Sequence, residues 1–244
     1  MLKISAMPAY KFHILCTRPL DELIIHKAAL KSIKIDLGSF IRTENIHSKE
    51  IIHQIESFQS KKITVIFTSM NAVDAVTKHL NAKPNWKIFS MGGITKEKVY
   101  QFFGEASVAA TAKNATALAE KIISNISSAA DEVVFFCGDQ RLNELPETLA
   151  QKGITVNELV VYKTVQTPKS IVKNYDAVVF FSPSAVHSFF SVNTLPTNTV
   201  IFSIGKTTTA TIQSYCSNMI ITSEWPGKEQ MIDRVMDYFD SNKK

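Results

Sequence analysis

The sequence predicts an α/β protein with two doubly wound parallel sheets, and three observations support this fold class. Short apolar, β-rich runs alternate with segments of helical spacing along the 244 residues. The apolar runs contain almost no polar residues, which is typical of parallel strands buried on both faces. Part of the chain also repeats at a constant offset. Strand, short turn and helix in repeated alternation indicate parallel sheets.

Six runs are predicted as strands because each joins apolar and β-branched residues between polar or glycine-containing turns. In chain order they are residues 14–16, 65–67, 87–89, 133–136, 177–181 and 200–202. Helical spacing of apolar residues lies between them, at residues 72–80, 95–103, 116–126 and 144–152. The segment that begins at Thr116 has the composition of a helix start, and Gly153 is a helix stop.

The internal repeat has an offset of 113 residues, from Phe67 to Phe180 and from Ile88 to Ile201. At this offset three strand, loop and helix units align without a gap. The helical pairs are Thr95 with Thr208, Val99 with Ile212, and Leu118 with Met231. A constant offset over about fifty residues favours two similar α/β domains, although any doubly wound sheet has a similar rhythm.

The repeat also indicates where the domains divide. The first copy has its strands between about residues 62 and 162, whereas the second, from about residue 173, has three, too few for an ordinary sheet. We expect the N-terminal segment 12–32 to supply a missing strand. Segments 33–42 and 159–166 then form a two-stranded β-ladder linker. The predicted flavodoxin-like domains are a discontinuous first domain, 1–36 with 167–244, and a second domain, 40–163.

Composition excludes several classes of protein. Hydrophobic residues make up 45% and charged residues 20%, which is ordinary globular usage and excludes a disordered chain. No apolar run approaches the ~18 residues of a membrane span, and the N-terminus lacks the continuous apolar core of a secretory signal. The net charge of +5 is dispersed, without the basic stripe of a nucleic-acid binder.

Cysteine and histidine usage argues against disulfides and metal sites. Cys16, Cys137 and Cys216 are far apart, with no C-x-x-C pair, and the six histidines are scattered. Cys16 and Cys137 end apolar runs and are expected to be ordinary buried thiols. We therefore expect a cytoplasmic protein without metal, cofactor, nucleic-acid partner or membrane contact.

Small polar residues follow each predicted strand. In parallel sheets ligands bind at the carboxyl ends of strands, where backbone N–H groups at helix starts point toward an anion. Each loop alone is equally well explained by helix capping. Six such loops in two facing domains favour a cleft for a ligand with several carboxylates or phosphates. No G-x-G-x-x-G, P-loop, G-x-S-x-G or H-E-x-x-H motif occurs, so the residues themselves indicate no standard catalytic centre.

The order and spacing of the loops resemble one family. The matching residues are Phe67-Thr68-Ser69 with Ala72-Val73, Cys137-Gly138 with Leu145-Pro146, Leu149 and Gly153, Val156 with Val161-Tyr162-Lys163-Thr164, Phe181-Ser182-Pro183-Ser184-Ala185-Val186, and Ile204-Gly205-Lys206-Thr207-Thr208. They resemble the strand-end motifs of uroporphyrinogen-III synthases. The resemblance covers about residues 63 to 240 and Thr17-Arg18-Pro19. Residues 36–40 depart from it, because they replace the Pro-containing crossing that we would expect.

The resemblance implies two α/β domains joined by a two-stranded ladder, and a lyase of haem and porphyrin biosynthesis. Such an enzyme cyclises hydroxymethylbilane, a linear tetrapyrrole with eight carboxylates, with loss of water and inversion of ring D. It implies Tyr162 and Thr207 as catalytic residues, with Tyr162 a proton or hydrogen-bond donor to the departing hydroxyl. The substrate-binding residues that it implies are Arg18, Ser69, Met70, Asn71, Gly92, Thr95, Gly138, Ser182, Pro183, Ser184, Lys206 and Thr208. Thr208 is also the expected helix cap, and Met70 stands where the family often has Pro.

Two alternatives remain open on the sequence. The same layout suits a non-catalytic binder or sensor of an anionic small molecule. A flavodoxin-like FMN site at Thr68 and Ser69 with Asn71 is a third, weaker hypothesis. As an enzyme, the protein is expected to be a monomer that receives its substrate from the preceding enzyme of the pathway.

Overall fold

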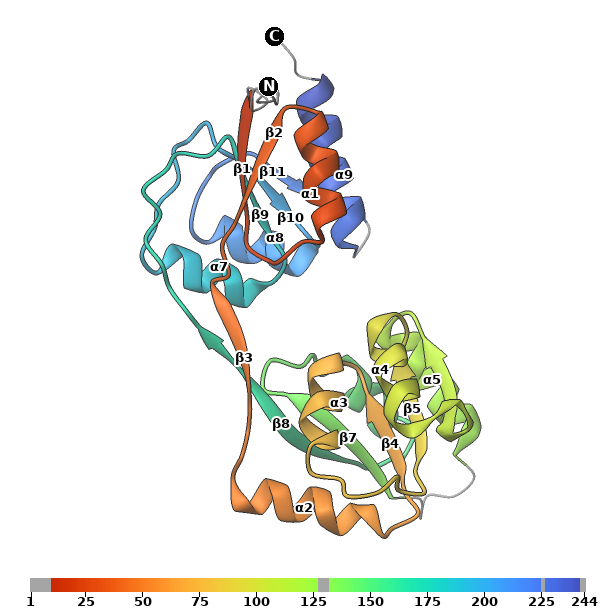
Figure 1. Cartoon of the computed structure of the whole chain (residues 1–244). Coiled ribbons are helices and arrows are strands. Elements are labelled where there is room, and N and C mark those ends of the chain that lie inside the picture. The colour runs from red at the N-terminus through yellow and green to blue at the C-terminus, as the bar shows by residue number, and fades with distance from the viewer. Residues whose placement is uncertain (1–9, 127–131, 225–226, 242–244) are drawn as a thin grey trace, which may run out of the picture. The chain divides into compact units, whose positions relative to one another are not determined.

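Two parallel β-sheets organise the chain, and the computed structural model describes residues 10–126, 132–224 and 227–241 (Figure 1). The chain divides into unit 1, residues 1–42 with 165–244, and unit 2, residues 43–164. The α/β fold class with parallel sheets is confirmed. That the predicted boundaries separate two domains, each able to fold by itself, stays a prediction.

Unit 2 is built around a six-stranded sheet in the order β3-β8-β7-β4-β5-β6. Its strands are β3 (Ile41–Asn45), β4 (Thr64–Phe67), β5 (Lys87–Met91), β6 (Val108–Ala112), β7 (Val133–Gly138) and β8 (Val156–Gln166). Its helices are α2 (Lys49–Gln59), α3 (Met70–Thr77), α4 (Ile94–Phe103), α5 (Ala115–Asn125), α6 (Glu144–Ala150) and a 3-10 turn (Glu105–Ser107).

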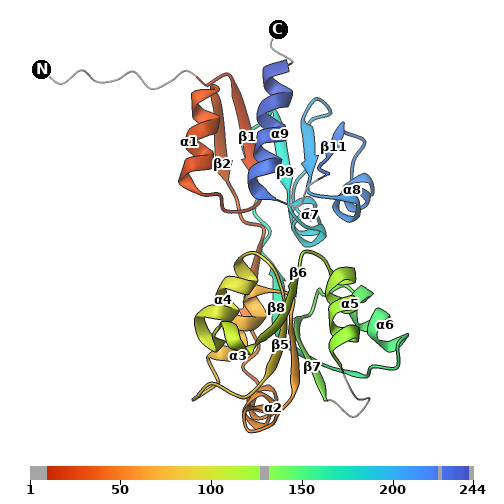
Figure 2. The same ribbon diagram turned by 90° about the vertical axis from the view of Figure 1, so that its right-hand side faces the viewer.

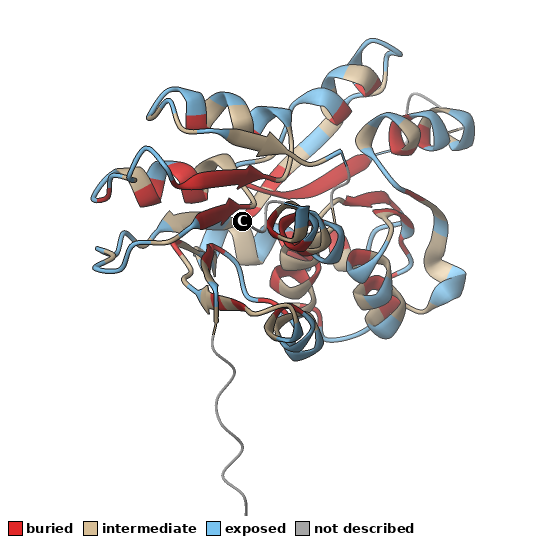
Figure 3. Cartoon of the chain, turned by 90° about the horizontal axis from the view of Figure 1, so that it is seen from above, coloured by how far each residue is buried: buried red, intermediate tan, exposed pale blue. Residues whose placement is uncertain are grey.

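Helices cover both faces of this sheet. Figure 2 shows α3 and α4 on one side and α5 and α6 on the other. Along β4, Val65 and Phe67 pack in the cluster formed with α2, α3 and α4, whereas Ile66 packs with α5 and α6. Every residue of β4 and β7 is buried, so these strands are almost entirely apolar apart from Thr64 and Gly138. Figure 3 shows continuous buried stretches on several strands, whereas buried and exposed residues alternate along the helices.

Unit 1 has a five-stranded parallel sheet in the order β11-β10-β9-β1-β2. Its strands are β1 (Phe12–Cys16), β2 (Ile33–Leu37), β9 (Ala177–Phe180), β10 (Val200–Ser203) and β11 (Ile220–Thr222). Its helices are α1 (Glu22–Leu30), α7 (Pro183–Phe190), α8 (Lys206–Gln213) and α9 (Lys228–Ser241). Buried residues of α1 and α9 pack on one face, and those of α7 and α8 on the other.

The predicted repeat is confirmed in the bounds of the elements. At the offset of 113, β4 corresponds to β9 over its full length, α3 corresponds to α7 over its full length, and β5 and α5 begin where β10 and α9 begin. The paired helix residues Val99 and Ile212, and Leu118 and Met231, are all 0% exposed. The two copies therefore share the positions of their buried residues as well as the order of their strands and helices.

The N-terminus completes the second copy, as expected. In unit 1, β1 and β2 stand beside β9, in the places that β7 and β8 occupy beside β4 in unit 2. Ile14 pairs with Ala177 on β9 and with Ile35 on β2. The first and last parts of the chain thus form one sheet.

The expectation that residues 33–42 form a single crossing was wrong. Residues 33–37 are β2, a parallel edge strand of unit 1, and the crossing is β3. Ile33 and Ile35 are buried, while Lys34 is only partly covered, so this edge strand alternates instead of reading as a continuous apolar run. The strands β6 and β11, also at sheet edges, were missed for the same reason.

The chain crosses between the units twice. It passes to unit 2 within β3 and returns within β8, and these two strands are neighbours. The Ile46 N–H donates to the Val161 carbonyl at 2.9 Å, and the Thr167 N–H donates to the Phe40 carbonyl at 2.8 Å. The expected two-stranded linker is therefore present.

A polar cluster fastens β2 to the segment before β9. The Asp36 carboxylate accepts hydrogen bonds from Lys173 Nζ at 2.9 Å and Tyr175 Oη at 3.1 Å. Burial by itself raises the pKa of Asp36, but the hydrogen bonds from Lys173 and Tyr175 lower it below its usual value. Burial, reinforced by Asp36, raises the pKa of Tyr175 to about 12.

We expect Asp36→Asn to lower the free energy of unfolding by about 1 kcal/mol at pH 7, because it removes the acceptor charge of two hydrogen bonds. A carboxyl with a lowered folded pKa stabilises the fold above its unfolded pKa of about 4 and loses this effect as the pH falls through the folded pKa. Urea unfolding should therefore separate wild type and variant at pH 7 and bring them together below roughly pH 3. Asp21→Asn, at a mostly exposed ion pair with Lys228, is the control and should change stability by less than about 0.5 kcal/mol.

Candidate active site

The residues predicted for the site lie at or just after the carboxyl ends of parallel strands, in two groups, except that Tyr162 lies within β8 opposite the end of β7. The unit 2 group consists of Ser69, Met70, Asn71, Gly92, Thr95, Gly138 and Tyr162. The unit 1 group consists of Arg18, Ser182, Pro183, Ser184, Lys206, Thr207 and Thr208. A single cleft formed by both groups stays a prediction.

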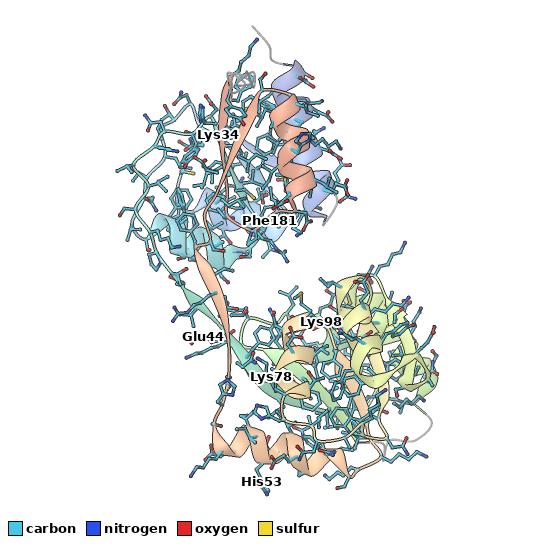
Figure 4. All side chains as sticks on the ribbon, viewed as in Figure 1. Lys34, Glu44, His53, Lys78, Lys98 and Phe181 are labelled. Carbon is cyan, nitrogen blue, oxygen red and sulfur yellow. The ribbon has the colours of Figure 1, made fainter. Side chains whose placement is uncertain are left out.

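In unit 2 the turn from β4 into α3 places Ser69 at the helix start. Ser69 Oγ accepts the N–H of Asn71 at 3.2 Å, so its own hydroxyl hydrogen can be donated elsewhere. Met70 is the first residue of α3. The ammonium of Lys98 on α4 (labelled in Figure 4) binds both carboxylate oxygens of Asp74 on α3 at 2.5 Å. This ion pair ties together the two helices whose first turns belong to the site.

The turn from β5 into α4 depends on two glycines. Gly93 has φ of +64°, a conformation that L side chains rarely adopt, and it is the N-cap residue of α4. Gly92 donates its N–H to the Ala112 carbonyl at 2.8 Å, so that N–H is already used within the sheet. The Thr95 side chain is buried, at 6% exposure.

Tyr162 lies in β8 opposite Gly138, the last residue of β7. Its side chain is half-buried and packs against the cluster that includes α3. Burial raises the pKa of Tyr162, and hydrogen bonding with Ser69 and Asn71 opposes the rise only in part. Tyr162 is thus protonated at neutral pH and adjoins the first turn of α3.

In unit 1 the turn from β9 into α7 follows Phe181, which Figure 4 labels. Ser182 Oγ accepts the N–H of Ala185 at 3.2 Å, and Pro183 occupies the first position of α7, where its missing N–H costs nothing. Ser184 follows it in the first turn.

The start of α8 differs from the expectation for Thr208. The N-cap residue is Gly205, with no side-chain cap, and Thr208 is buried in the helix at 2% exposure. The expectation that Thr208 caps this helix was wrong because α8 begins at Lys206, two residues earlier. Thr207 and Lys206 are exposed, as is Arg18 after β1.

A cavity of about 610 Å³ beside α8 was not predicted from the sequence. Its lining includes Lys206, Thr209, Gln213 and Thr222, and the hydroxyls of Thr209 and Thr222 lie 2.7 Å apart. Thr222 belongs to the edge strand β11, which was not predicted either, so the sequence offered no signal for this pairing.

Neither a metal cluster nor a membrane-spanning helix occurs in the described residues. Within residues 10–126, 132–224 and 227–241, no group of three or more His, Cys, Asp or Glu side chains could hold a metal ion. No helix in the part of the chain that the structure describes is long and apolar enough to cross a membrane.

Comparison with known proteins identifies the family. A model of uroporphyrinogen-III synthase HemD matches residues 33–233, most of the chain. The chain belongs to the uroporphyrinogen-III synthase family. Members of this family are cyclising lyases of tetrapyrrole biosynthesis that act on a small-molecule substrate.

Solved structures confirm the two-domain fold. Uroporphyrinogen-III synthetase from Helicobacter pylori superposes with a TM-score of 0.66 at 16% identity, over 93% of this chain and 99% of that one. A mutant uroporphyrinogen III synthase from the extremely thermophilic bacterium Thermus thermophilus has a TM-score of 0.60 at 13% identity, over 95% of this chain and 100% of that one. At this identity the likeness establishes the fold and leaves the residue roles to be argued from this chain.

Ser182 and Ser184 are expected to contribute differently to the stability of the fold. We expect Ser182→Ala to lower the free energy of unfolding by about 1 kcal/mol, because it removes the N-cap of α7. Ser184→Ala should cost less than about 0.5 kcal/mol, since the Ser184 hydroxyl has no partner among the described residues. Urea unfolding of both variants tests this, and equal losses would contradict the assignment of the cap to Ser182.

Proposed function

We propose that this protein is a uroporphyrinogen-III synthase, which cyclises hydroxymethylbilane with loss of water and inversion of ring D. Family membership supports this proposal, and the single observation within the structure that carries it is the position of Tyr162. A protonated phenol beside the first turn of α3, at the carboxyl edge of a parallel sheet, is a suitable donor to a leaving hydroxyl.

The proposed chemistry makes few demands on the protein. The pyrrole nitrogen of the substrate drives departure of the hydroxyl and leaves an azafulvene. Attack at a substituted ring carbon then gives a spiro intermediate, which reopens and closes with the last ring inverted. The protein folds the chain, and assists one proton transfer through Tyr162. Positioning alone can lower a barrier by several kcal/mol, and fixed backbone dipoles stabilise developing charge.

Substrate recognition is assigned to backbone N–H groups and two positively charged side chains. The first turns of α3, α4, α7 and α8 present N–H groups at the carboxyl ends of their strands, which suits carboxylates. Arg18 and Lys206 are exposed at the same ends and supply charge for ion pairs. The net charge of +5 favours attraction of a substrate with eight carboxylates.

Thr207 is the second proposed catalytic residue, because it is exposed at the first turn of α8 whereas Thr208 is buried. The proposal further includes a monomeric, cytoplasmic enzyme that accepts its substrate directly from the preceding enzyme of the pathway. A non-catalytic binder of an anionic small molecule is the less favoured alternative.

The decisive experiment supplies the purified protein with enzymatically generated hydroxymethylbilane and separates the oxidised porphyrin isomers by chromatography. The bilane closes without catalysis to the type I isomer, so each reaction contains its own reference. We expect predominantly type III product. Type I product alone would contradict the proposed function and favour the binder.

We expect Tyr162→Phe to reduce turnover more than Thr208→Ser does. Tyr162→Phe removes the proton donor while keeping the ring, and general acid catalysis contributes on the order of a hundredfold or more. Thr208→Ser keeps a hydroxyl at a buried position and serves as the comparison. Initial rates of type III formation measure both, and an unchanged rate in Tyr162→Phe would remove the role assigned to Tyr162.

The pH dependence of turnover offers a separate check on Tyr162. Because burial raises the pKa of this phenol, activity that needs its proton should persist above pH ~10, the ordinary pKa of tyrosine, and fall only at higher pH. Rates of type III formation across the alkaline range, corrected for spontaneous closure, measure this. A loss of activity centred well below pH ~10 in wild type, but absent in Tyr162→Phe, would contradict the raised pKa.

A further inference from the structure

The strand β8 changes its regular alternation at Tyr162. Leu159 and Val161 pack on the face covered by α2, α3 and α4, whereas Val156 and Val160 pack on the face covered by α5 and α6. Simple alternation would direct Tyr162 toward α5 and α6. Its side chain instead packs on the same face as that of its neighbour Val161.

A β-bulge causes this change. Cys137 of β7 pairs with Val160, but the next residue, Gly138, pairs with Tyr162, so Val161 is an extra residue without a partner on β7. A bulge of this kind redirects the side chain that follows it, and bulges are common beside active sites. Here it brings Tyr162 into the cluster that includes Ala72 and Val73 of the first turn of α3.

Gly138 makes room for the redirected ring. A Cβ atom on residue 138 would lie 2.4 Å from Cζ and 2.7 Å from Oη of Tyr162, distances that real Cβ contacts essentially never show. The backbone of Gly138 does not itself require glycine, because its φ is not among the positive values in the described chain. The absence of a side chain at this position is therefore explained by the Tyr162 ring.

Asp139 closes the bulge on the other side of Tyr162. Its N–H donates to the Tyr162 carbonyl at 3.1 Å, and its carboxylate Oδ1 accepts the N–H of Thr164 at 2.9 Å. These two bonds hold β8 directly at Tyr162 and two residues beyond it. The Asp139 charge also disfavours the phenolate, and so helps to keep the Tyr162 proton in place.

We propose that Gly138 and Asp139 are positioning residues for Tyr162: Gly138 admits the ring against the end of β7, and Asp139 holds the bulge in β8 that directs the phenol to the first turn of α3. The expected effect of Gly138 and Asp139 on turnover rests on the proposed function. Their expected effect on the position of the Tyr162 ring does not. It also assigns Gly138 a role toward Tyr162 in place of the substrate contact expected from the sequence.

The structural part of the proposal can be tested without substrate. The full-length protein would be labelled with 13Cζ-tyrosine, and the Tyr162 resonance, one of six, would be assigned by its loss in Tyr162→Phe. We expect Gly138→Ala to move this resonance and to lower the pKa of Tyr162, because the ring is pushed toward water. Asp139→Asn should also lower that pKa, because the neighbouring negative charge is removed.

Glu147→Gln is the matched control for Asp139→Asn. It removes one negative charge from the following helix, α6, at an exposed side chain that makes no contact with Tyr162. Its Tyr162 resonance and pKa should equal those of wild type. An unchanged Tyr162 resonance and pKa in both Gly138→Ala and Asp139→Asn would overturn the proposal, whatever the activity of the protein.

Kinetics then test the effect on the reaction. Gly138→Ala and Asp139→Ala, of which the second removes the acceptor of the Thr164 N–H, should lower kcat for type III formation about tenfold or more. KM should change less than about threefold, because a misplaced catalytic group slows the reaction more than it weakens substrate binding. In the Tyr162→Phe background the same substitutions should have little further effect, because they act through the phenol. Equal losses in both backgrounds would overturn the positioning role.

The two measurements distinguish the possible failures. Wild-type protein that yields only type I product, with a shifted Tyr162 resonance in both variants, would refute the proposed function and keep the positioning of the ring. If Gly138→Ala does not fold, Asp139→Ala carries the test, because it removes the acceptor of the Thr164 N–H and leaves Gly138 in place. Asp139→Asn is its comparison, because the Asn side chain retains an oxygen that can accept this N–H.

Discussion

The requirement that a parallel sheet be covered on both faces governs the architecture of each unit. The central strands β4, β7, β9 and β10 are wholly buried, so helices must pack on both sides of them. Each connection between parallel strands then runs through a helix, and the turns that lead from these strands into their helices fall at the same edge of the sheet. Within each unit, this constraint brings polar and glycine-containing turns that are far apart in the sequence to one edge of the sheet.

The two units have matching arrangements of parallel strands but different connections between them. In unit 2 one continuous segment supplies the five parallel strands β4 to β8, whereas unit 1 combines β9, β10 and β11 with β1 and β2 from the N-terminus. The shared offset of 113 residues covers only the part that both copies have in the same order. The strands β3 and β8 are a consequence of this arrangement, because the chain must leave unit 1 and return to it.

Three departures from regular geometry lie at the proposed site in unit 2. The bulge in β8, the close approach of Gly138 to the Tyr162 ring and the positive φ of Gly93 all lie at the carboxyl edge of the unit 2 sheet. The central strand β4 pairs with β5 and β7 in unbroken register, whereas the edge strand β6 shifts its register with β5 between Ile88 and Phe89. The bulge in β8 therefore changes the direction of the Tyr162 side chain beside central strands that keep a regular register.

Local sequence determined the fold class, the central strands, the helices from α3 to α6 and the internal repeat. These features depend on side chains that are near in sequence and on unbroken apolar runs. The edge strands β2, β6 and β11 were not predicted as strands of these sheets, because they are covered less completely and are not apolar runs. The resemblance to uroporphyrinogen-III synthases correctly indicated the family, because the order of strand-end motifs is itself a property of the sequence.

Only the tertiary structure decided which face of β8 carries Tyr162. The alternation of Leu159, Val160 and Val161 points its side chain toward α5 and α6, and the register with Gly138 reverses this. Likewise, Thr208 was expected to cap its helix, yet α8 begins at Lys206, which leaves Thr207 exposed and buries Thr208 within the helix. In both cases the outcome depends on hydrogen bonding and packing between segments far apart in the chain, which no local pattern of residues records.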